Sequence, residues 1–279
     1  MRSRRIGVGQ VFWLVAGALF FLVPLYGTLE YSLEVKGGYG FKHYLSILQD
    51  SGSPGFPGFK DAFIFSLKLA AGTVAIGVAL MVPTVYWVNL RLPRVRKVID
   101  FIAVLPFVIP PVALAVGINR LFTTQPSWVL GQPQKISFWL VSRPVILVLA
   151  YVILALPFTY RALDAGMRAI DLHTLTEAAQ SVGAGWTRIL FSVILPNIRY
   201  AMLSAAFLTI TLVLGEYTMS SLLLFNTFAV YVEYTGEAKA NPAAALAIIS
   251  FALTWMAMLA ILFVGRGAGR RQSQVTQTR

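Results

Sequence analysis

The stretch EAAQSVGAGWTRILFSVILP, Glu177 to Pro196, is polar and contains glycines, whereas most of the chain is apolar. In the TLTE that leads into it, Thr174 and Glu177 have the spacing of a capping box, so we predict a helix starting at Thr174. Four residues then recur at helical spacing and share one face: Leu175, Ala178, Ala179 and Val182. We expect Gly183 to end this helix in a left-handed conformation.

A second short helical pattern follows the glycines and ends at Leu195 and Pro196. It consists of apolar residues at the same spacing: Trp186, Ile189, Leu190 and Val193. Helices this short are marginal alone in water, so packing must hold them. Small side chains at Ala178 and Ala179 allow another protein to approach closely. The sequence therefore predicts two short helices that dock onto a partner.

The rest of the chain has the composition of a membrane protein. Of 279 residues, 57% are hydrophobic and only 12% are charged, about half the charged fraction of globular proteins, and the mean hydropathy is +0.73. Since about 20 apolar residues span a bilayer, we predict an all-α integral membrane protein with six transmembrane helices. The expected spans are Ile6–Leu29, Leu69–Leu90, Phe101–Asn119, Pro144–Tyr160, Tyr200–Leu224 and Asn241–Gly265.

The basic residues predict how these spans are oriented. MRSRR before the first span could belong to a signal peptide, but the apolar run is too long and no small-x-small cleavage site follows, which favours an anchor. Lys and Arg are more numerous in the connections on the side of the two termini, including RLPRVRK at 91–97, so both termini are expected in the cytoplasm. The basic pI of about 10.2 therefore reflects membrane flanks rather than nucleic-acid binding. The chain has no cysteine, which excludes disulfides and thiolate metal sites.

Prolines interrupt the third expected span, which contains LPFVIPPVAL with Pro106, Pro110 and Pro111. Proline removes an amide donor and clashes with the preceding turn, so this helix should kink or break where other helices cover it. Pro110 and Pro111 are consistent with a plain packing kink and equally with an element of a substrate path.

One carboxylate lies within the fifth expected span, in LGEYTMSSLL. An acidic residue in a membrane helix is costly and normally faces a polar interior, so Glu216, with Tyr217 beside it, is a candidate for the substrate path. Two structural explanations remain: Glu216 lies near the outer interface, or it pairs with a basic residue such as Arg120.

The opening stretch resembles the EAA loop of permeases from binding-protein-dependent ABC importers. The motif residues are Glu177, Ala178, Ala179, Gly183, Leu195 and Pro196, with Val193 where the family usually has Ile. The resemblance implies a type I ABC importer permease fold in the bacterial cytoplasmic (inner) membrane, with the EAA loop as a cytoplasmic coupling helix. The implied ATPase-coupling residues are Leu175, Glu177, Ala178, Ala179, Gly183, Trp186, Leu195 and Pro196.

The resemblance also implies partners: a dimer of cytoplasmic ATPases, a second permease subunit that is expected to be a different one, and an extracytoplasmic solute-binding protein. The chain contains no G-x-x-x-x-G-K-[ST] phosphate loop. We therefore expect that it is not an enzyme and holds no cofactor, and that ATP and Mg²⁺ bind the partner ATPase. Residues 1–60 would form an N-terminal span and outer loop, 61–265 the permease core with the EAA loop at about 164–197, and 266–279 a basic cytoplasmic tail.

The solute is less well defined. LGEYTMSSLL and the later NPAAALAIIS resemble the spermidine/putrescine subgroup and its relatives, so a polyamine is the first expectation. Thiamine, iron(III), phosphonate and sugar importers share the same plan. Two other classes remain open: an ion-coupled secondary transporter that uses Glu216, and a membrane scaffold that transports nothing. The absence of a convincing internal repeat disfavours the secondary transporter, and the coupling-loop pattern disfavours the scaffold.

Overall fold

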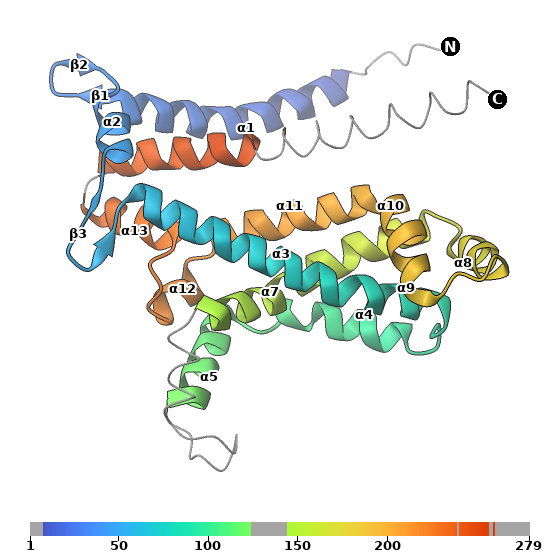
Figure 1. Ribbon diagram of the computed structural model, residues 1–279. Coiled ribbons are helices and arrows are strands. Elements are labelled where there is room, and N and C mark those ends of the chain that lie inside the picture. Colours follow the sequence, from blue (N-terminus) through green and yellow to red (C-terminus); the bar gives the residue numbers. More distant parts are fainter. Residues whose placement is uncertain (1–7, 124–143, 239, 257–258, 260–279) are drawn as a thin grey trace. The chain divides into compact units, whose positions relative to one another are not determined.

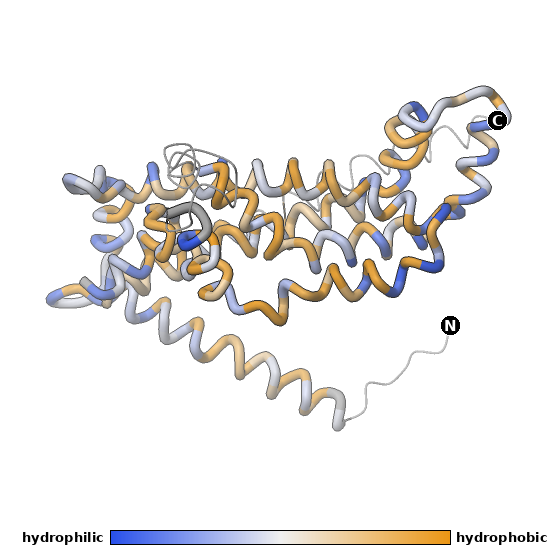
Figure 2. Tube along the Cα trace, turned by 90° about the horizontal axis from the view of Figure 1, so that it is seen from below, coloured by the Kyte–Doolittle hydropathy of each residue, from blue (hydrophilic) through white to orange (hydrophobic). Residues whose placement is uncertain are grey.

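The computed structural model describes residues 8–123, 144–238, 240–256 and 259, and it is mostly helical, as the composition predicts. The long helices follow the long apolar runs (Figure 1), because a helix satisfies all its backbone polar groups internally, as lipid requires. Hydrophobic positions extend along these helices and hydrophilic positions gather at their ends and in the loops (Figure 2). The described residues fall into two compact units.

Unit 1 holds the N-terminal residues up to Lys60 together with Tyr231–Trp255. Its elements are α1 (Val8–Leu33), β1 (Glu34–Val35), β2 (Gly38–Tyr39), α2 (Lys42–Leu48), β3 (Gly52–Ser53), β4 (Phe56–Pro57), most of α13 (Phe228–Ala238) and the helix Ala240–Met256. The strands form two antiparallel hairpins of two residues each. Gly52 and Gly55 take positive φ values of 85° and 87° in the second hairpin, a conformation that glycine adopts more readily than other residues.

Unit 2 holds Asp61–Val230 and contains the residues of the EAA loop. Its elements are most of α3 (Phe59–Leu90), α4 (Arg96–Val104), the 3-10 turn η1 (Leu105–Phe107), α5 (Pro111–Thr123), α7 (Pro144–Arg168), α8 (Leu172–Ser181), α9 (Trp186–Ile189), the π-helical turn η2 (Leu190–Ile194), α10 (Leu195–Asn197), α11 (Arg199–Gly215) and α12 (Thr218–Leu222). Within this unit α8 and α9 lie at one end and α12 at the other (Figure 1).

Helix α7 is the centre of unit 2. It packs along α11, and Gly166 of α7 comes so close to Ala201 of α11 that an added β-carbon would overlap the alanine side chain. Leu163 and Met167 of α7 are buried in the same cluster as Tyr86 of α3. Because lipid is as apolar as these side chains, close fit rather than loss of water stabilises such helix pairs, and small residues permit it.

Three of the described helices are long and apolar enough to cross a membrane, and five spans result if each of two bent helix pairs counts as one. The three are Val11–Leu33, Phe59–Leu90 and Pro144–Arg168. The sixth expected span, Asn241–Gly265, is described only as the shorter apolar helix Ala240–Met256. Except for Leu259, the rest of this span lies outside the described residues. The same is true of the basic tail 266–279 and of the N-terminal arginines.

The third expected span is broken, as its prolines predict. Arg96–Phe107 and Pro111–Arg120 meet at an angle of 89°. Pro111 is the first residue of α5, where the missing amide costs nothing. The described residues meet the expectation that other helices cover the break only in part: Phe107 packs edge-on against Phe158 of α7, with ring centroids 5.1 Å apart, but Phe107 and Val108 are 57% and 74% exposed.

The fifth expected span also differs from the sequence-based prediction. Its helix α11 ends at Gly215, and Glu216 has extended backbone angles. Glu216 therefore lies in a break between α11 and α12 and not inside a continuous helix, as Tyr200–Leu224 was predicted to be.

Candidate coupling loop and substrate-path residues

The first helix of the EAA loop is α8, and its N-cap lies three residues before the one that the capping box suggested. Its N-cap is Asp171, whose carboxylate accepts hydrogen bonds from the Thr174 amide at 3.2 Å and the Thr174 hydroxyl at 2.8 Å. An N-cap aspartate satisfies the amide three residues ahead, so Thr174 becomes an interior residue and the predicted start is wrong. The hydrogen bond from the Thr174 hydroxyl, and then that from its amide, lowers the pKa of Asp171 below its ordinary value.

Gly183 ends α8 as predicted, with φ at +80°. The amide of Ala184 donates to the Ala179 carbonyl at 3.0 Å, and the amide of Gly183 donates to the Gln180 carbonyl at 2.9 Å. These two bonds make a Schellman motif, which satisfies the last carbonyls of the helix. A side chain at Gly183 would meet no atom within 4 Å, so the backbone conformation rather than space favours glycine there.

Two sides of α8 differ in exposure. Leu172, Thr176 and Ala179 are buried, and the Thr176 hydroxyl lies 3.4 Å from the hydroxyl of Tyr86 on α3. Glu177 and Ala178 are exposed, and Val182 just beyond the helix is 82% exposed. The predicted face forms, with Leu175, Ala178, Ala179 and Val182 lining one side of a shallow groove of about 450 Å³. Three of these four side chains are not part of the buried side, so the face remains available to another molecule.

The second expected helix is present as a nearly continuous run of α9, η2 and α10. Trp186 begins it and stacks on Trp87 of α3, with ring centroids 5.9 Å apart. The run includes a π-helical turn, which the sequence did not predict. Pro196 has no amide to donate, and the side chain of Asn197 donates to the Val193 carbonyl at 2.7 Å. Leu195 is partly buried and Pro196 is exposed.

Glu216 and Tyr217 lie at the break before α12, at the end of unit 2 away from α8 (Figure 1). The Glu216 carboxylate accepts a hydrogen bond from the Met219 amide, with oxygens at 3.0 and 3.1 Å. It therefore satisfies a free amide in the first turn of α12, which is a structural role. Tyr217 is 43% exposed. Pro110 and Pro111 lie at the other break, before α5, so the candidate substrate-path residues belong to two separate breaks.

The sequence analysis did not predict a polar network that is centred on α7. Asp164 is buried and accepts hydrogen bonds from Arg96 at 2.9 and 3.1 Å, from Asn89 at 2.9 Å and from Arg168. Next to it, Tyr160 donates to Asp100 at 2.6 Å. The available signal was only the spacing of four residues between Asp164 and Arg168 on one helix, because Arg96 lies 68 residues away in the sequence. Among the described residues, no group of His, Asp and Glu could hold a metal ion.

Comparison with known proteins agrees with this arrangement. Residues 71–270 match the family of binding-protein-dependent transport system inner membrane components. The molybdenum transport system permease protein ModB of Azotobacter vinelandii is 30% identical over 159 residues, which cover 56% of this chain and 69% of that protein. The chloroplastic sulfate permease 2 of Chlamydomonas reinhardtii is 26% identical over 213 residues, 72% of this chain and 57% of that protein.

A solved structure shows the same fold. A bacterial ABC transporter involved in the import of the acidic polysaccharide alginate aligns with a TM-score of 0.66 at 18% identity, over 94% of this chain and 93% of that chain. The family match over residues 71–270 includes all of the EAA loop and both helix breaks. The chain belongs to the family of binding-protein-dependent transport system inner membrane components, the permeases of ABC importers.

Proposed function

We propose that this chain forms half of the translocation pathway of an ATP-driven importer in a bacterial cytoplasmic membrane. It would cross the membrane six times with both termini in the cytoplasm and pair with a second permease subunit. A solute-binding protein would deliver the solute from outside. ATP and Mg²⁺ would be bound by a cytoplasmic ATPase dimer, since the chain itself has no phosphate loop.

The exposure of α8 carries this proposal. A ten-residue helix is marginal alone, yet α8 is capped at both ends and is held to α3 through Tyr86 and Thr176. Its opposite side presents Glu177 and Ala178 to solvent. Because Trp186 stacks on Trp87, a force on α8 would reach α3 and, through the second short helix, α11. We therefore assign the coupling role to Leu175, Glu177, Ala178, Ala179, Gly183, Trp186, Leu195 and Pro196.

For the solute we propose only a small polar compound. The polyamine expectation came from the resemblance of LGEYTMSSLL and NPAAALAIIS to the spermidine/putrescine subgroup, and the carboxylate that would suit a cation, Glu216, accepts a hydrogen bond from the Met219 amide. The same observation weakens an ion-coupled transporter that would use Glu216. The names of the relatives refer to molybdenum, sulfate and ferric transport, and none of these solutes is a polyamine. Pro110, Pro111 and Tyr217 remain candidates for lining the path.

The test is Glu177→Lys, which reverses the charge on the exposed side of α8. We expect the protein to insert normally and to lose the co-purifying ATPase, identified by its phosphate loop, at least about tenfold, since interface hot spots contribute about 2 kcal/mol or more. Glu233→Lys is the matched control, because Glu233 is equally exposed but belongs to α13 in unit 1. Undiminished ATPase with Glu177→Lys would contradict the assignment.

A further inference from the structure

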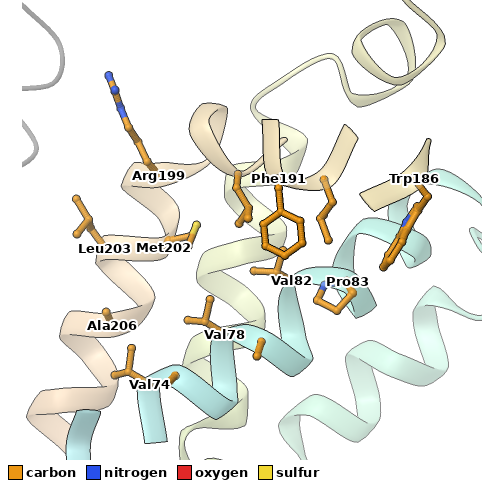
Figure 3. A pocket seen from close by; sticks show the side chains of 14 residues that line it. Val74, Val78, Val82, Pro83, Trp186, Phe191, Arg199, Met202, Leu203 and Ala206 are labelled. Atoms are coloured by element: carbon orange, nitrogen blue, oxygen red, sulfur yellow. The ribbon is translucent and has the colours of Figure 1, made fainter. Parts of the chain in front are cut away.

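An apolar groove of about 800 Å³ extends between α3 and α11, and the second short helix of the EAA loop closes one side of it (Figure 3). Valines of α3 face small and flexible side chains of α11 across it: Val74, Val78 and Val82 on one side, and Met202, Leu203 and Ala206 on the other. Phe191, at its edge, is 66% exposed. The groove belongs entirely to unit 2 and is separate from the shallow groove beside α8.

One end of this groove is chemically different from the rest. Arg199 is the only charged side chain among the described residues that line it, and it points away from the apolar lining, with Val74 and Ala206 at the opposite end (Figure 3). Arg199 is also the first residue of α11, where the helix dipole disfavours a cation, so helix stability does not explain it. Its guanidinium lies 5.0 Å from the centre of the Tyr200 ring.

The groove also has side chains that are typical of a membrane interface. Trp186 lines the groove and stacks on Trp87, and the guanidinium of Arg91 lies 5.3 Å from the centre of the Trp87 ring. Tryptophan, tyrosine and arginine gather where the hydrocarbon meets the headgroups. The groove therefore combines an apolar length with a basic and aromatic end, which matches an amphiphile with an anionic headgroup.

We propose that an anionic phospholipid of the cytoplasmic leaflet occupies this groove. An acyl chain would lie between α3 and α11, and the phosphate would bind Arg199. Basic pockets between helices on the cytoplasmic side favour such headgroups. The proposal depends on the proposed orientation, which places Arg199 on the cytoplasmic side. The lipid would touch both α11 and the second short helix, and would fill space between the coupling loop and the membrane-spanning part.

A membrane helix fits the groove less well than a lipid does. The obvious candidate is α1 of a second copy, which is apolar from Val8 to Leu29 and has no carboxylate for Arg199 in that stretch. In the proposed orientation its cytoplasmic end follows Arg2, Arg4 and Arg5, which would repel Arg199. A helix of this kind would cover the apolar lining but would bring no anionic group to the basic end.

The experiment uses the full chain in vesicles of phosphatidylethanolamine with a small fraction of phospholipid that carries a photoreactive acyl chain. The reactive lipid is either phosphatidylglycerol or phosphatidylcholine, with the same chain. We expect crosslinks within 74–83 and 199–206, and about fivefold more of them with phosphatidylglycerol, as one basic residue near an anionic surface predicts. Arg199→Gln should remove this preference, and Arg199→Lys should retain it.

Arg161→Gln is the matched control, since Arg161 is an exposed arginine of α7 that does not line the groove, and this variant should keep the preference. Equal crosslinking by the two lipids would overturn the proposal, as would a photoreactive residue at Phe191 that captures a protein helix in place of lipid. Failure here is distinguishable from failure of the proposed function, because lipid capture needs neither ATPase nor solute. A wrong orientation would be detected separately by labelling of the loops.

Discussion

The two bent helix pairs of unit 2 change direction by similar angles, 89° at Val108–Pro110 and 76° at Ile198, but they are held in different ways. At the first bend Phe107 and Val108 are exposed, and the preceding α4 is tied to α7 by polar contacts through Arg96 and Asp100. At the second bend Ile194 and Ile198 are 0% and 1% exposed.

The difference indicates which bend is suited to transmit a displacement. Prolines alone are enough to produce the first bend, and the described part of the chain covers it only in part. The second bend is enclosed by α7, where Gly166 allows α11 to approach at Ala201. Closely packed interiors shift between discrete arrangements rather than deforming gradually. We therefore infer that motion of the EAA loop reaches α11 through the second bend.

The largest expected effect is at the close contact beside the second bend. Gly166→Ala would force a methyl group into Ala201, and overpacking of this kind costs about 1–3 kcal/mol. We expect a clearly lower melting temperature in detergent, measured by the loss of monodisperse protein on heating. The matched control is Gly117→Ala in α5, beside the first bend, where an added β-carbon meets nothing within 4 Å.

Gly117→Ala should be neutral or slightly stabilising, because alanine is the better helix former. Equal loss of stability in the two variants would remove the distinction between a packed and an open bend.

The polar contacts beside the first bend should have the next largest effect. Asp164→Asn removes the charge that Arg96 and Arg168 share, at a residue only 7% exposed. Hydrogen bonds to charged groups contribute about 1.5–3 kcal/mol, and the arginines can recover part of this by contact with water, so we expect a loss of about 1–2 kcal/mol. Thermal unfolding in detergent measures it, with the exposed carboxylate of Asp61→Asn as the control. No difference between the two variants would show that burial does not matter at Asp164.

The smallest effect is expected at the start of α8. Asp171→Ala removes the N-cap and should speed hydrogen exchange of the first-turn amides several-fold at pH 7, whereas Asp171→Asn keeps a capping side chain and should change it little. Since the folded-state pKa of Asp171 is lowered, its contribution is complete above the ordinary pKa of 3.8 and is lost as the pH falls further. Only the protein with aspartate should therefore lose first-turn protection in acid.

If Asp171→Asn lost its first-turn protection over the same pH range as the unaltered protein, the assigned cap would be wrong.

Particular residues show how far the sequence could predict this arrangement. Apolar runs located the long helices, and Gly183 and Pro110–Pro111 marked a helix end and a break, because glycine and proline act through their own backbone. The start of α8 was missed because Asp171 and Glu177 are both placed to accept from the Thr174 amide, and local spacing does not decide between them. Asp164 was missed because its partners Asn89 and Arg96 lie about 70 residues away and come together only in the folded chain.

Glu216 shows a different limit of sequence reading. An acidic residue in an apolar run was read as a functional charge within a helix, yet the helix ends just before it. The sequence does not reveal the break, because no proline marks it and the helix ends at Gly215 inside an otherwise uncharged run. The role in coupling, the sidedness and the solute remain proposals that the fold supports.

The most direct test of the central claim is the side of the membrane on which the EAA loop lies. Because the chain has no cysteine, Val182→Cys introduces the sole thiol at a position 82% exposed, and Tyr39→Cys does the same at a position 70% exposed in the β1–β2 hairpin. With a membrane-impermeant thiol reagent, we predict labelling of Val182→Cys only from the cytoplasmic side and of Tyr39→Cys only from the outside. Labelling of Val182→Cys from outside in intact cells would contradict a coupling loop that meets a cytoplasmic ATPase.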